Sequence, residues 1–168
     1  MIKYQLEEHY LKTAKTKLDQ FLVESWEKRD KDLPYSSPNE ALIAASLIEK
    51  ETASRAEKPD VASVIVNRLR KKMKLQIDAT VNFALNDYKR LRNNDYKVNH
   101  PYNTYKIKGL PPGPICNISR SSLLAALHPN HTHFLFYVAS GDGSHLFAST
   151  YSEHLANIKK VHRKVRSL

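Results

Sequence analysis

A proline- and glycine-rich stretch from Asn99 to Ser119 constrains the fold of this chain most. It holds four of the eight prolines and two of the four glycines of the whole sequence. Proline fixes φ and removes a backbone donor, so a segment this rich in proline cannot continue a helix or lie inside a sheet. The stretch is predicted to be a stiff loop with one extended arm, which divides the chain into two unlike parts.

Helical patterns fill the part before this loop. Ser37, Pro38 and Glu40 supply an N-cap, a proline at the first helical position and a carboxylate at the third, so a helix is predicted to begin there. Further helices are predicted from Pro59 and from Asp78, where the aspartate would be the cap. Ahead of them, residues 1–32 are predicted to form one amphipathic helix, because apolar side chains recur at three- and four-residue spacings at Ala14, Leu18, Phe21, Leu22 and Trp26.

The pattern changes after the loop. A short helix is predicted over 120–128, and two β-rich runs around the turn at 140–144 predict a hairpin. Thr150, followed three residues later by Glu153, predicts the start of a last helix with a basic end. The order predicts an α+β fold: a helical N-terminal half, a loop-rich part, a β-hairpin and a closing C-terminal helix. A chain of 168 residues that is 41% hydrophobic can bury a core as a single domain.

The net charge of +10 favours an anionic partner such as a nucleic acid, an acidic cell-wall polymer or a membrane surface, without choosing among them. The basic run from Arg68 to Lys74 is predicted to be a solvated helix end. No apolar run is long enough for a membrane span, and the N-terminal residues are charged where a signal peptide is apolar, so neither is expected in this chain. Cys116 has no second cysteine to pair with and is expected to be buried and inert.

Two carboxylates, Glu49 and Glu51, close the second predicted helix. On a helical wheel Glu51 falls among apolar residues such as Ile43 and Leu47, whereas Glu49 falls beside smaller side chains. Apolar surroundings raise the pKa of a carboxyl group, and a protonated glutamate can act as a general acid. A surface glutamate paired with Arg55, four residues on, is the alternative, and helix geometry does not decide between them.

The stiff loop contains a second unusual pattern. Tyr102, Asn103 and Tyr105 offer aromatic faces and an amide, a combination that binds sugar rings by stacking and hydrogen bonding. The alternative is a structural turn whose tyrosines pack inward. The residues alone support both interpretations equally.

Together these segments resemble the endolytic murein transglycosylases, also called the YceG-like or MltG family. The matching blocks recur in the family's order over residues 33–154. They are "EKET" at 49–52, "NRLRKKMKLQID" at 67–78, "YNTYKIKGLPPGPI" at 102–115, "LLAALHP" at 123–129 and "FYVASGDGSHLF" at 136–147. The chain departs from the family at turn positions, with Ala79 for a proline and residues 117–119 for an "NPG" sequence.

The resemblance implies cleavage of peptidoglycan glycan strands between N-acetylmuramic acid and N-acetylglucosamine, giving 1,6-anhydro ends without a metal or cofactor. It implies one catalytic domain over 1–168, made of the helix at 1–32, a transglycosylase-like core at 33–154 and a basic helix end at 155–168. The second glutamate of "EKE", Glu51, would be catalytic, on the helix that begins at Pro38. The residues implied to bind substrate are Gln76, Asp78, Tyr102, Asn103, Tyr105 and, from the hairpin, His145.

The resemblance also places such a protein at the periplasmic face of the bacterial inner membrane. Its partners would be glycan strands, with cell-wall synthesis proteins and the oligomeric state left open. The family's N-terminal membrane helix and the small domain after it are not found here, which predicts a fragment or a truncated gene product.

Three rival interpretations remain open. A basic nucleic-acid-binding module agrees with the charge, but the basic run at 68–74 contains no aromatic residue, so no nucleic acid is expected. A metal enzyme built on His128, His131 and His133 lacks a helical pair of ligands one turn apart. An inactive wall-binding remnant is the third, and only an assay excludes it.

Overall fold

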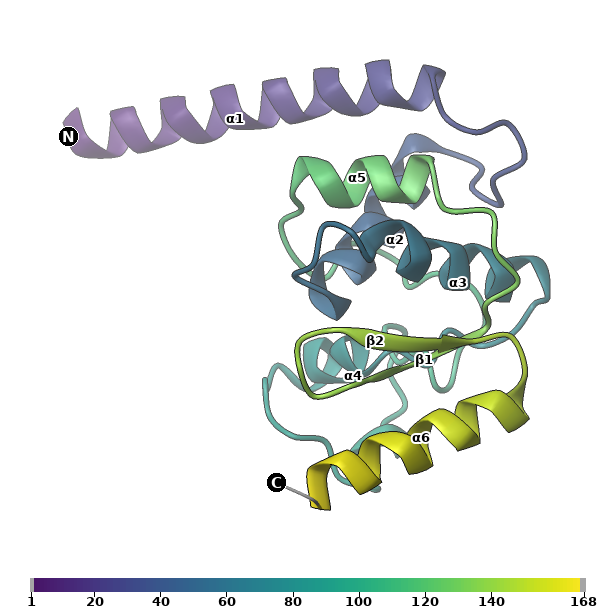
Figure 1. Cartoon of the computed structure of the whole chain (residues 1–168). Helices are drawn as coiled ribbons and strands as arrows, with labels where there is room; N and C mark the ends of the chain where they lie inside the picture. Colours follow the sequence, from purple (N-terminus) through teal and green to yellow (C-terminus); the bar gives the residue numbers. More distant parts are fainter. Residues whose placement is uncertain (1, 167–168) are drawn as a thin grey trace.

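The computed structural model describes residues 2–166, and its elements confirm the predicted α+β class. Figure 1 shows a group of helices packed above a two-stranded hairpin, with a last helix below it. The helices are α1 (Ile2–Glu27), α2 (Pro38–Glu51), α3 (Lys58–Arg70), α4 (Asp78–Leu85), α5 (Arg120–Leu127) and α6 (Tyr151–Arg166), with a 3₁₀ turn at Asp95–Lys97 and strands β1 (Phe136–Ala139) and β2 (His145–Ala148).

Helix α2 is the centre of the core and begins at the predicted cap. The Ser37 hydroxyl accepts a hydrogen bond from the Glu40 backbone N–H, and the Glu40 carboxylate reaches back to the backbone N–H of Ser36 at 2.7 Å. The helix is buried over most of its surface because it packs against both α3 and α5. The side chains with no exposed surface are Ala41, Ala44, Ala45, Ser46, Leu47 and Ile48. Burial on this scale fixes the direction in which the end of α2 points.

The predicted stiff loop has no helix or strand between Asn99 and Ser119. Its fully buried Thr104 accepts a hydrogen bond from the Ile77 N–H at 2.9 Å and contacts the hydroxyl of Thr80 at the same distance. Further along, the Ile115 N–H donates to the Ser46 hydroxyl at 3.0 Å. The loop is therefore held against both the start of α4 and the middle of α2.

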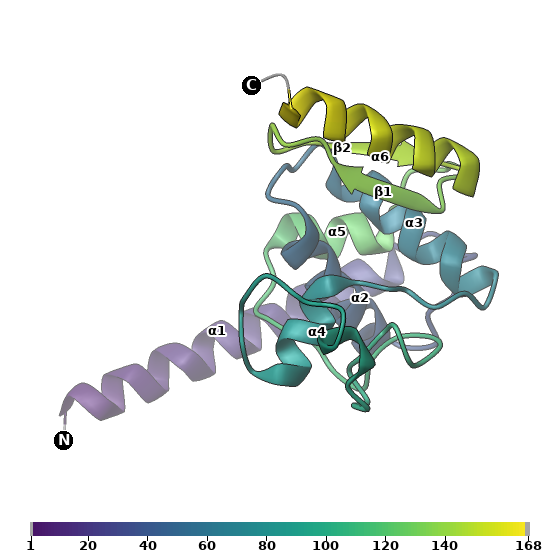
Figure 2. The ribbon, with the colours of Figure 1, turned by 90° about the horizontal axis from the view of Figure 1, so that it is seen from below.

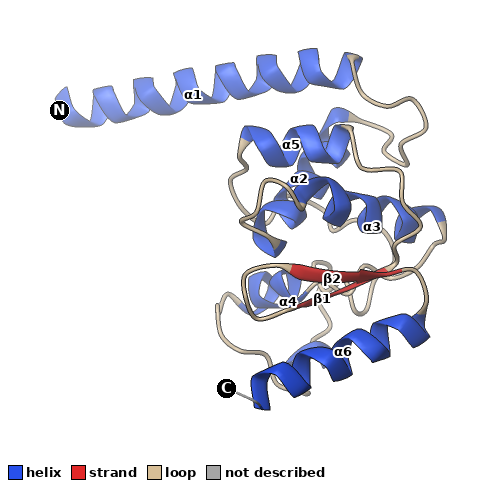
Figure 3. Ribbon diagram, in the orientation of Figure 1, coloured by secondary structure: helices blue, strands red, loops and turns tan. Residues whose placement is uncertain are grey.

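The two strands pair antiparallel, with Tyr137 opposite Phe147 and Ala139 opposite His145. Figures 2 and 3 show the hairpin between the helical group and α6, which packs against both strands. Helix α6 starts at the predicted box, since the Glu153 carboxylate accepts from the backbone N–H of Thr150 at 3.0 Å. The predicted basic end of this helix runs to residue 168, and residues 167–168 lie outside the described residues.

Helix α1 differs from the predicted one in its end and in its packing. It stops at Glu27, ahead of the end predicted near residue 32, and Figure 1 shows its N-terminal half extending away from the rest. Among the described side chains of α1, Phe21, Leu22 and Trp26 pack on the core, and they belong to its last turns. Within residues 2–166, no helix combines the length and the apolar character that crossing a bilayer requires.

Candidate functional site

A cavity of about 440 Å³ opens where the end of α2, the segment before α4, the hairpin and α6 meet. The structure brings five of the seven predicted site residues to it: Glu51, Gln76, Asp78, Tyr105 and His145. The sequence did not point to several other residues of its lining, among them Arg68, Phe136, Tyr137, Tyr151 and His154.

Glu51 is the last residue of α2, and the hairpin covers its carboxyl group. The Tyr137 hydroxyl donates a hydrogen bond of 2.6 Å to Glu51 Oε2. Burial raises the pKa of Glu51, and the negative charge of Asp78 raises it further, against the lowering effects of the Tyr137 hydrogen bond and of His145. Arg55, the partner in the surface alternative, is exposed. Glu51 is thus a carboxyl group that holds its proton more strongly than an exposed glutamate does.

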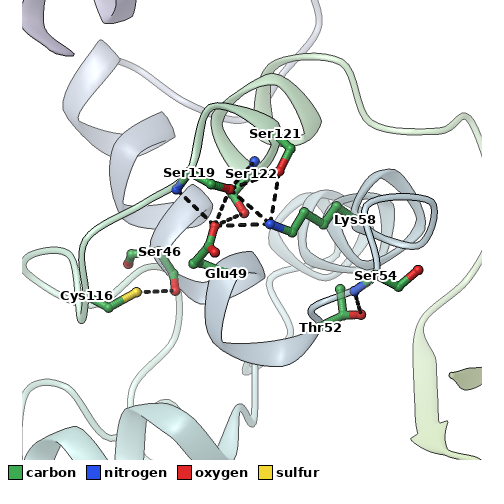
Figure 4. A network of polar contacts seen from close by, with 9 residues as sticks. All are labelled: Ser46, Glu49, Thr52, Ser54, Lys58, Cys116, Ser119, Ser121 and Ser122. Carbon is green, nitrogen blue, oxygen red and sulfur yellow. Dashed lines mark hydrogen bonds and ion pairs between the residues drawn. The ribbon is translucent and has the colours of Figure 1, made fainter. Parts of the chain in front are cut away.

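Glu49, two residues earlier, lies in a contrasting environment (Figure 4). Its Oε2 accepts hydrogen bonds from the backbone N–H of Ser119, from the hydroxyls of Ser119 and Ser122, and from Lys58 Nζ at 3.1 Å. Burial by itself would raise the pKa of Glu49, but these hydrogen bonds outweigh it and lower the pKa to about 2. Glu49 therefore stays ionised and ties α2 to α3 and α5, while Glu51 faces the cavity.

Asp78 is held by two tyrosines. The Tyr105 hydroxyl donates to its Oδ1 at 2.6 Å and the Tyr96 hydroxyl to its Oδ2 at 3.2 Å. Burial raises the pKa of both tyrosines, as does the neighbouring Asp78 carboxylate, so both remain hydrogen-bond donors. Asp78 was predicted to cap α4, but it is the first helical residue and Ile77 occupies the cap position, because the Asp78 side chain turns toward the tyrosines.

His145 enters the cavity from β2, with its ring oriented by Glu57. The His145 Nδ1 lies 2.9 Å from Glu57 Oε2, and its backbone N–H donates to Oε1 at 2.8 Å. Burial would raise the pKa of Glu57, but the hydrogen bonds and charge of His145 outweigh it and lower the pKa. An ionised Glu57 accepts from Nδ1–H, which leaves Nε2 without a hydrogen bond to the described residues.

Arg68 contradicts the prediction that the whole basic run at 68–74 is solvated. Its side chain is buried, because this end of α3 packs against the chain leading into β1, where Arg68 Nε donates to the Leu135 carbonyl at 2.6 Å. Neighbouring Arg70, Lys71 and Lys72 are exposed as predicted. The sequence spacing could have predicted this burial, because Arg68 follows the buried Val64 by four residues and so lies on the same face of α3.

Tyr102 and Asn103 do not reach the cavity, which corrects their predicted place in its wall. Asn103 has no exposed surface, and its amide donates to the carbonyls of Tyr96 at 3.1 Å and Val98 at 2.7 Å. The ring of Tyr102 packs 4.6 Å from that of Phe83. These contacts support the structural-turn alternative for this pair, while Tyr105 from the same segment does line the cavity.

The remaining predicted groups lie elsewhere. His128 Nδ1 is 2.9 Å from Asp30 Oδ1, and among the side chains that the structure describes no three histidine, cysteine or acidic groups are placed to hold a metal ion. Cys116 is half-buried rather than buried, with its thiol 3.4 Å from the Ser46 carbonyl. Burial raises the pKa of that thiol.

Comparison with known proteins identifies the family. The model of the YceG-like family matches residues 3–160, nearly the whole chain. The chain belongs to the YceG-like family. Two curated relatives are named endolytic murein transglycosylase. The one from Bacillus subtilis (strain 168) is 46% identical over 70% of this chain and 33% of its own length, and the one from Streptococcus pneumoniae serotype 2 is 30% identical over 85% of this chain and 29% of its own.

Among solved structures, this YceG-like chain is similar to the crystal structure of a YceG-like protein from Listeria monocytogenes. The two are 42% identical with a TM-score of 0.67, over 71% of this chain and 39% of that one. The chain spans about a third of the length of the curated relatives that it matches.

Proposed function

We propose that this YceG-like chain is a lytic transglycosylase that cleaves the β-1,4 bond between N-acetylmuramic acid and N-acetylglucosamine within glycan strands of peptidoglycan. One observation carries the proposal: Glu51, in the family's "EKE" position, lies at a cavity with its pKa raised by burial. The printed names of the relatives support murein as the substrate.

In the first step Glu51 acts as general acid. Its pKa lies above that of an ordinary glutamate, so it carries a proton to give to the leaving glycosidic oxygen. Among the described residues, Tyr137 is the one that bonds the Glu51 carboxyl group, and it bonds Oε2. Oε1 is left to carry the proton toward the substrate. The carboxylate formed by the transfer keeps the Tyr137 hydrogen bond, and this bond stabilises it.

In the second step the substrate supplies its own nucleophile. The 6-hydroxyl of the muramic acid closes on C1 of the same sugar as the bond from C1 to the leaving oxygen breaks, with the large effective molarity of a group within the same molecule. Glu51, now a carboxylate, takes the proton of that hydroxyl and so acts as general base. The products are a 1,6-anhydromuramoyl end and a free 4-hydroxyl on the other fragment, and the reaction consumes no water, metal or cofactor.

Asp78 has a different part in this scheme. Both of its oxygens already accept hydrogen bonds from Tyr105 and Tyr96, so its position is fixed. Its negative charge raises the pKa of Glu51 and thereby keeps the acid protonated. With Gln76, Tyr105 and His145 it would also contact sugar hydroxyls along the cavity.

A hydrolase is the second candidate, because Asp78 and Glu51 line the same cavity and glycoside hydrolysis uses two carboxylates. In that reaction Asp78 would activate water or attack C1. The transglycosylase is the stronger proposal, because the curated relatives are named endolytic murein transglycosylase and because Tyr105 and Tyr96 already hold the Asp78 carboxylate in place by one hydrogen bond to each oxygen.

The proposal places the activity at the periplasmic face of the inner membrane, where glycan strands are the partner and cell-wall synthesis proteins are further candidates. A matched pair of variants tests it. Glu51→Gln keeps the Tyr137 hydrogen bond but cannot donate a proton. Glycan cleavage, measured by chromatography of the products, should therefore be lost. Glu49→Gln, assayed well below its melting temperature, should retain most cleavage. The reverse result would refute the assignment of Glu51.

A further inference from the structure

Arg68 brings a positive charge to the cavity that no described carboxylate neutralises. Arg68 is 8% exposed, and it takes part in none of the ion pairs between described side chains. Its partners are neutral: the carbonyls of Lys74, Leu75 and Leu135 and the amide oxygen of Gln76. Buried cations in proteins are usually paired with an anion, so this wall of the cavity lacks a counter-charge.

The carboxylates nearest to the cavity are committed to other donors. Asp78 accepts from two tyrosines, Glu57 accepts from His145, and Glu51 accepts from Tyr137. None of them is bonded to Arg68. An anion that pairs with this guanidinium would therefore come from a bound molecule.

The guanidinium is held in one orientation with one nitrogen unused. Nε donates to the Leu135 carbonyl at 2.6 Å, and Nη1 donates to the Leu75 carbonyl at 2.9 Å. Nη2, which carries two N–H groups, makes no hydrogen bond to the described residues. The main-chain contacts preorganise these two donors, which lowers the entropy lost when an acceptor binds.

A second polar group without a hydrogen-bond partner lines the same cavity. His154 Nδ1 is buried and has no hydrogen-bond partner. The His154 ring stacks on the Phe136 ring with centroids 5.1 Å apart. The Arg68 guanidinium carbon lies 5.2 Å from the centroid of the Phe136 ring. Burial lowers the pKa of His154, and the charge of Arg68 lowers it further, so this histidine is a neutral donor next to a fixed cation.

We propose that Arg68 Nη2, together with His154 from the same cavity lining, binds a carboxylate that the substrate carries beside the scissile bond. The inference rests on the proposed function, because it names the part of the glycan strand that this wall recognises. Peptidoglycan offers two sources of the group: the lactyl carboxylate of muramic acid that has lost its peptide, and the carboxylates of an attached stem peptide. With either source, Arg68 and His154 would bind a charged group of the substrate, in addition to the sugar hydroxyls bound by the rest of the cavity.

Binding to chemically modified strands tests this with the Arg68 side chain intact. The Glu51→Gln protein, which should not cleave, is titrated by calorimetry with peptide-free strands and with peptide-bearing strands, each in native form and with its carboxylates converted to neutral amides. Loss of one charge-assisted hydrogen bond should weaken binding about tenfold or more. If amidation weakens the binding of peptide-free strands, the bound group is the lactyl carboxylate. If amidation weakens the binding of peptide-bearing strands only, the bound group is a carboxylate of the stem peptide.

Equal affinities of native and amidated strands in both pairs would overturn the inference and leave the proposed function standing. Binding of none of the strands would overturn both. In a second arm, Arg68→Gln should abolish the difference between native and amidated strands, whereas Arg70→Gln should preserve it, because Arg70 is an exposed arginine two residues on that pairs with Asp32. If circular dichroism shows Arg68→Gln to be unfolded, the strand comparison decides alone.

Discussion

Tyr137 and Glu51 lie 86 positions apart in the chain, and the tyrosine hydroxyl donates a 2.6 Å hydrogen bond to the glutamate. The bond joins β1 to the end of α2 across the cavity. Burial raises the pKa of Glu51 and this bond lowers it, so the pair sets the pH at which the acid loses its proton. Burial also raises the pKa of Tyr137 far above its usual range, so the hydroxyl remains a donor.

Tyr137→Phe removes a hydrogen bond that favours the ionised form of Glu51. The pKa of Glu51 should then rise further, and the alkaline limb of kcat/KM against pH should move to higher pH. The pH profile of glycan cleavage measures this, with a fall in the maximal rate as the carboxyl group loses its anchor. An alkaline limb that moves to lower pH would show that Tyr137 does not act on the titrating acid.

Asp78→Asn should move the same limb in the opposite direction. The charge of Asp78 raises the pKa of Glu51, so a neutral asparagine lets Glu51 ionise at lower pH. Asparagine keeps the size of the side chain and one acceptor for the Tyr105 hydroxyl. Cleavage should persist at acidic pH with an earlier alkaline decline. Complete loss at every pH, in a folded protein, would instead support Asp78 as a catalytic carboxylate.

Glu49 should stabilise the fold in a pH-dependent way. Its pKa is about 2 in the folded protein against an ordinary value of 4.5, so its contribution is complete above about pH 4.5 and is lost as pH falls toward 2. Glu49→Gln should reduce the free energy of unfolding at pH 7 by about 3 kcal/mol, because it leaves Lys58 buried without its anion.

Urea unfolding at several pH values measures this contribution. The difference between the two proteins should narrow between pH 5 and pH 3, where the wild-type protein loses stability that the variant never had. A constant difference over this range would mean that the Glu49 charge is not the cause.

Asn103→Ala should destabilise the protein by about 2–3 kcal/mol, because it empties a fully buried position and takes the donor from the carbonyls of Tyr96 and Val98. The exposed Asn99→Ala in the same segment is the control and should change stability by less than about 0.5 kcal/mol. Chemical denaturation measures both. Unchanged stability of Asn103→Ala together with weaker glycan binding would restore the predicted sugar-binding role.

Local signals in the sequence predicted much of this fold. The cap at Ser37 and Pro38 set the start of α2, and the helical period then turned Glu51 toward apolar neighbours and Glu49 away from them. Cap geometry and helical period depend on residues within one or two turns, so one sequence is enough to read them. The turn at 140–144 predicted the hairpin for the same reason.

The partners of the site residues could not be predicted in this way. Tyr137, which bonds Glu51, was one aromatic residue in a strand, and Arg68 was one cation in a basic run until packing of α3 turned it inward. Asn103 has the chemistry of a sugar ligand, yet its amide is used by the loop backbone. Each of these roles is set by residues that only the folded chain brings together.

Cleavage in heavy-oxygen water tests the central claim most directly. If Glu51 is the acid and the 6-hydroxyl of muramic acid is the nucleophile, water takes no part in bond breaking. Mass spectrometry of glycan strands digested in H₂¹⁸O should then find 1,6-anhydromuramoyl ends that carry no label, and chelators should not slow the reaction. Reducing ends that carry ¹⁸O would contradict the claim, since they would show a hydrolase and make Asp78 its second catalytic carboxylate.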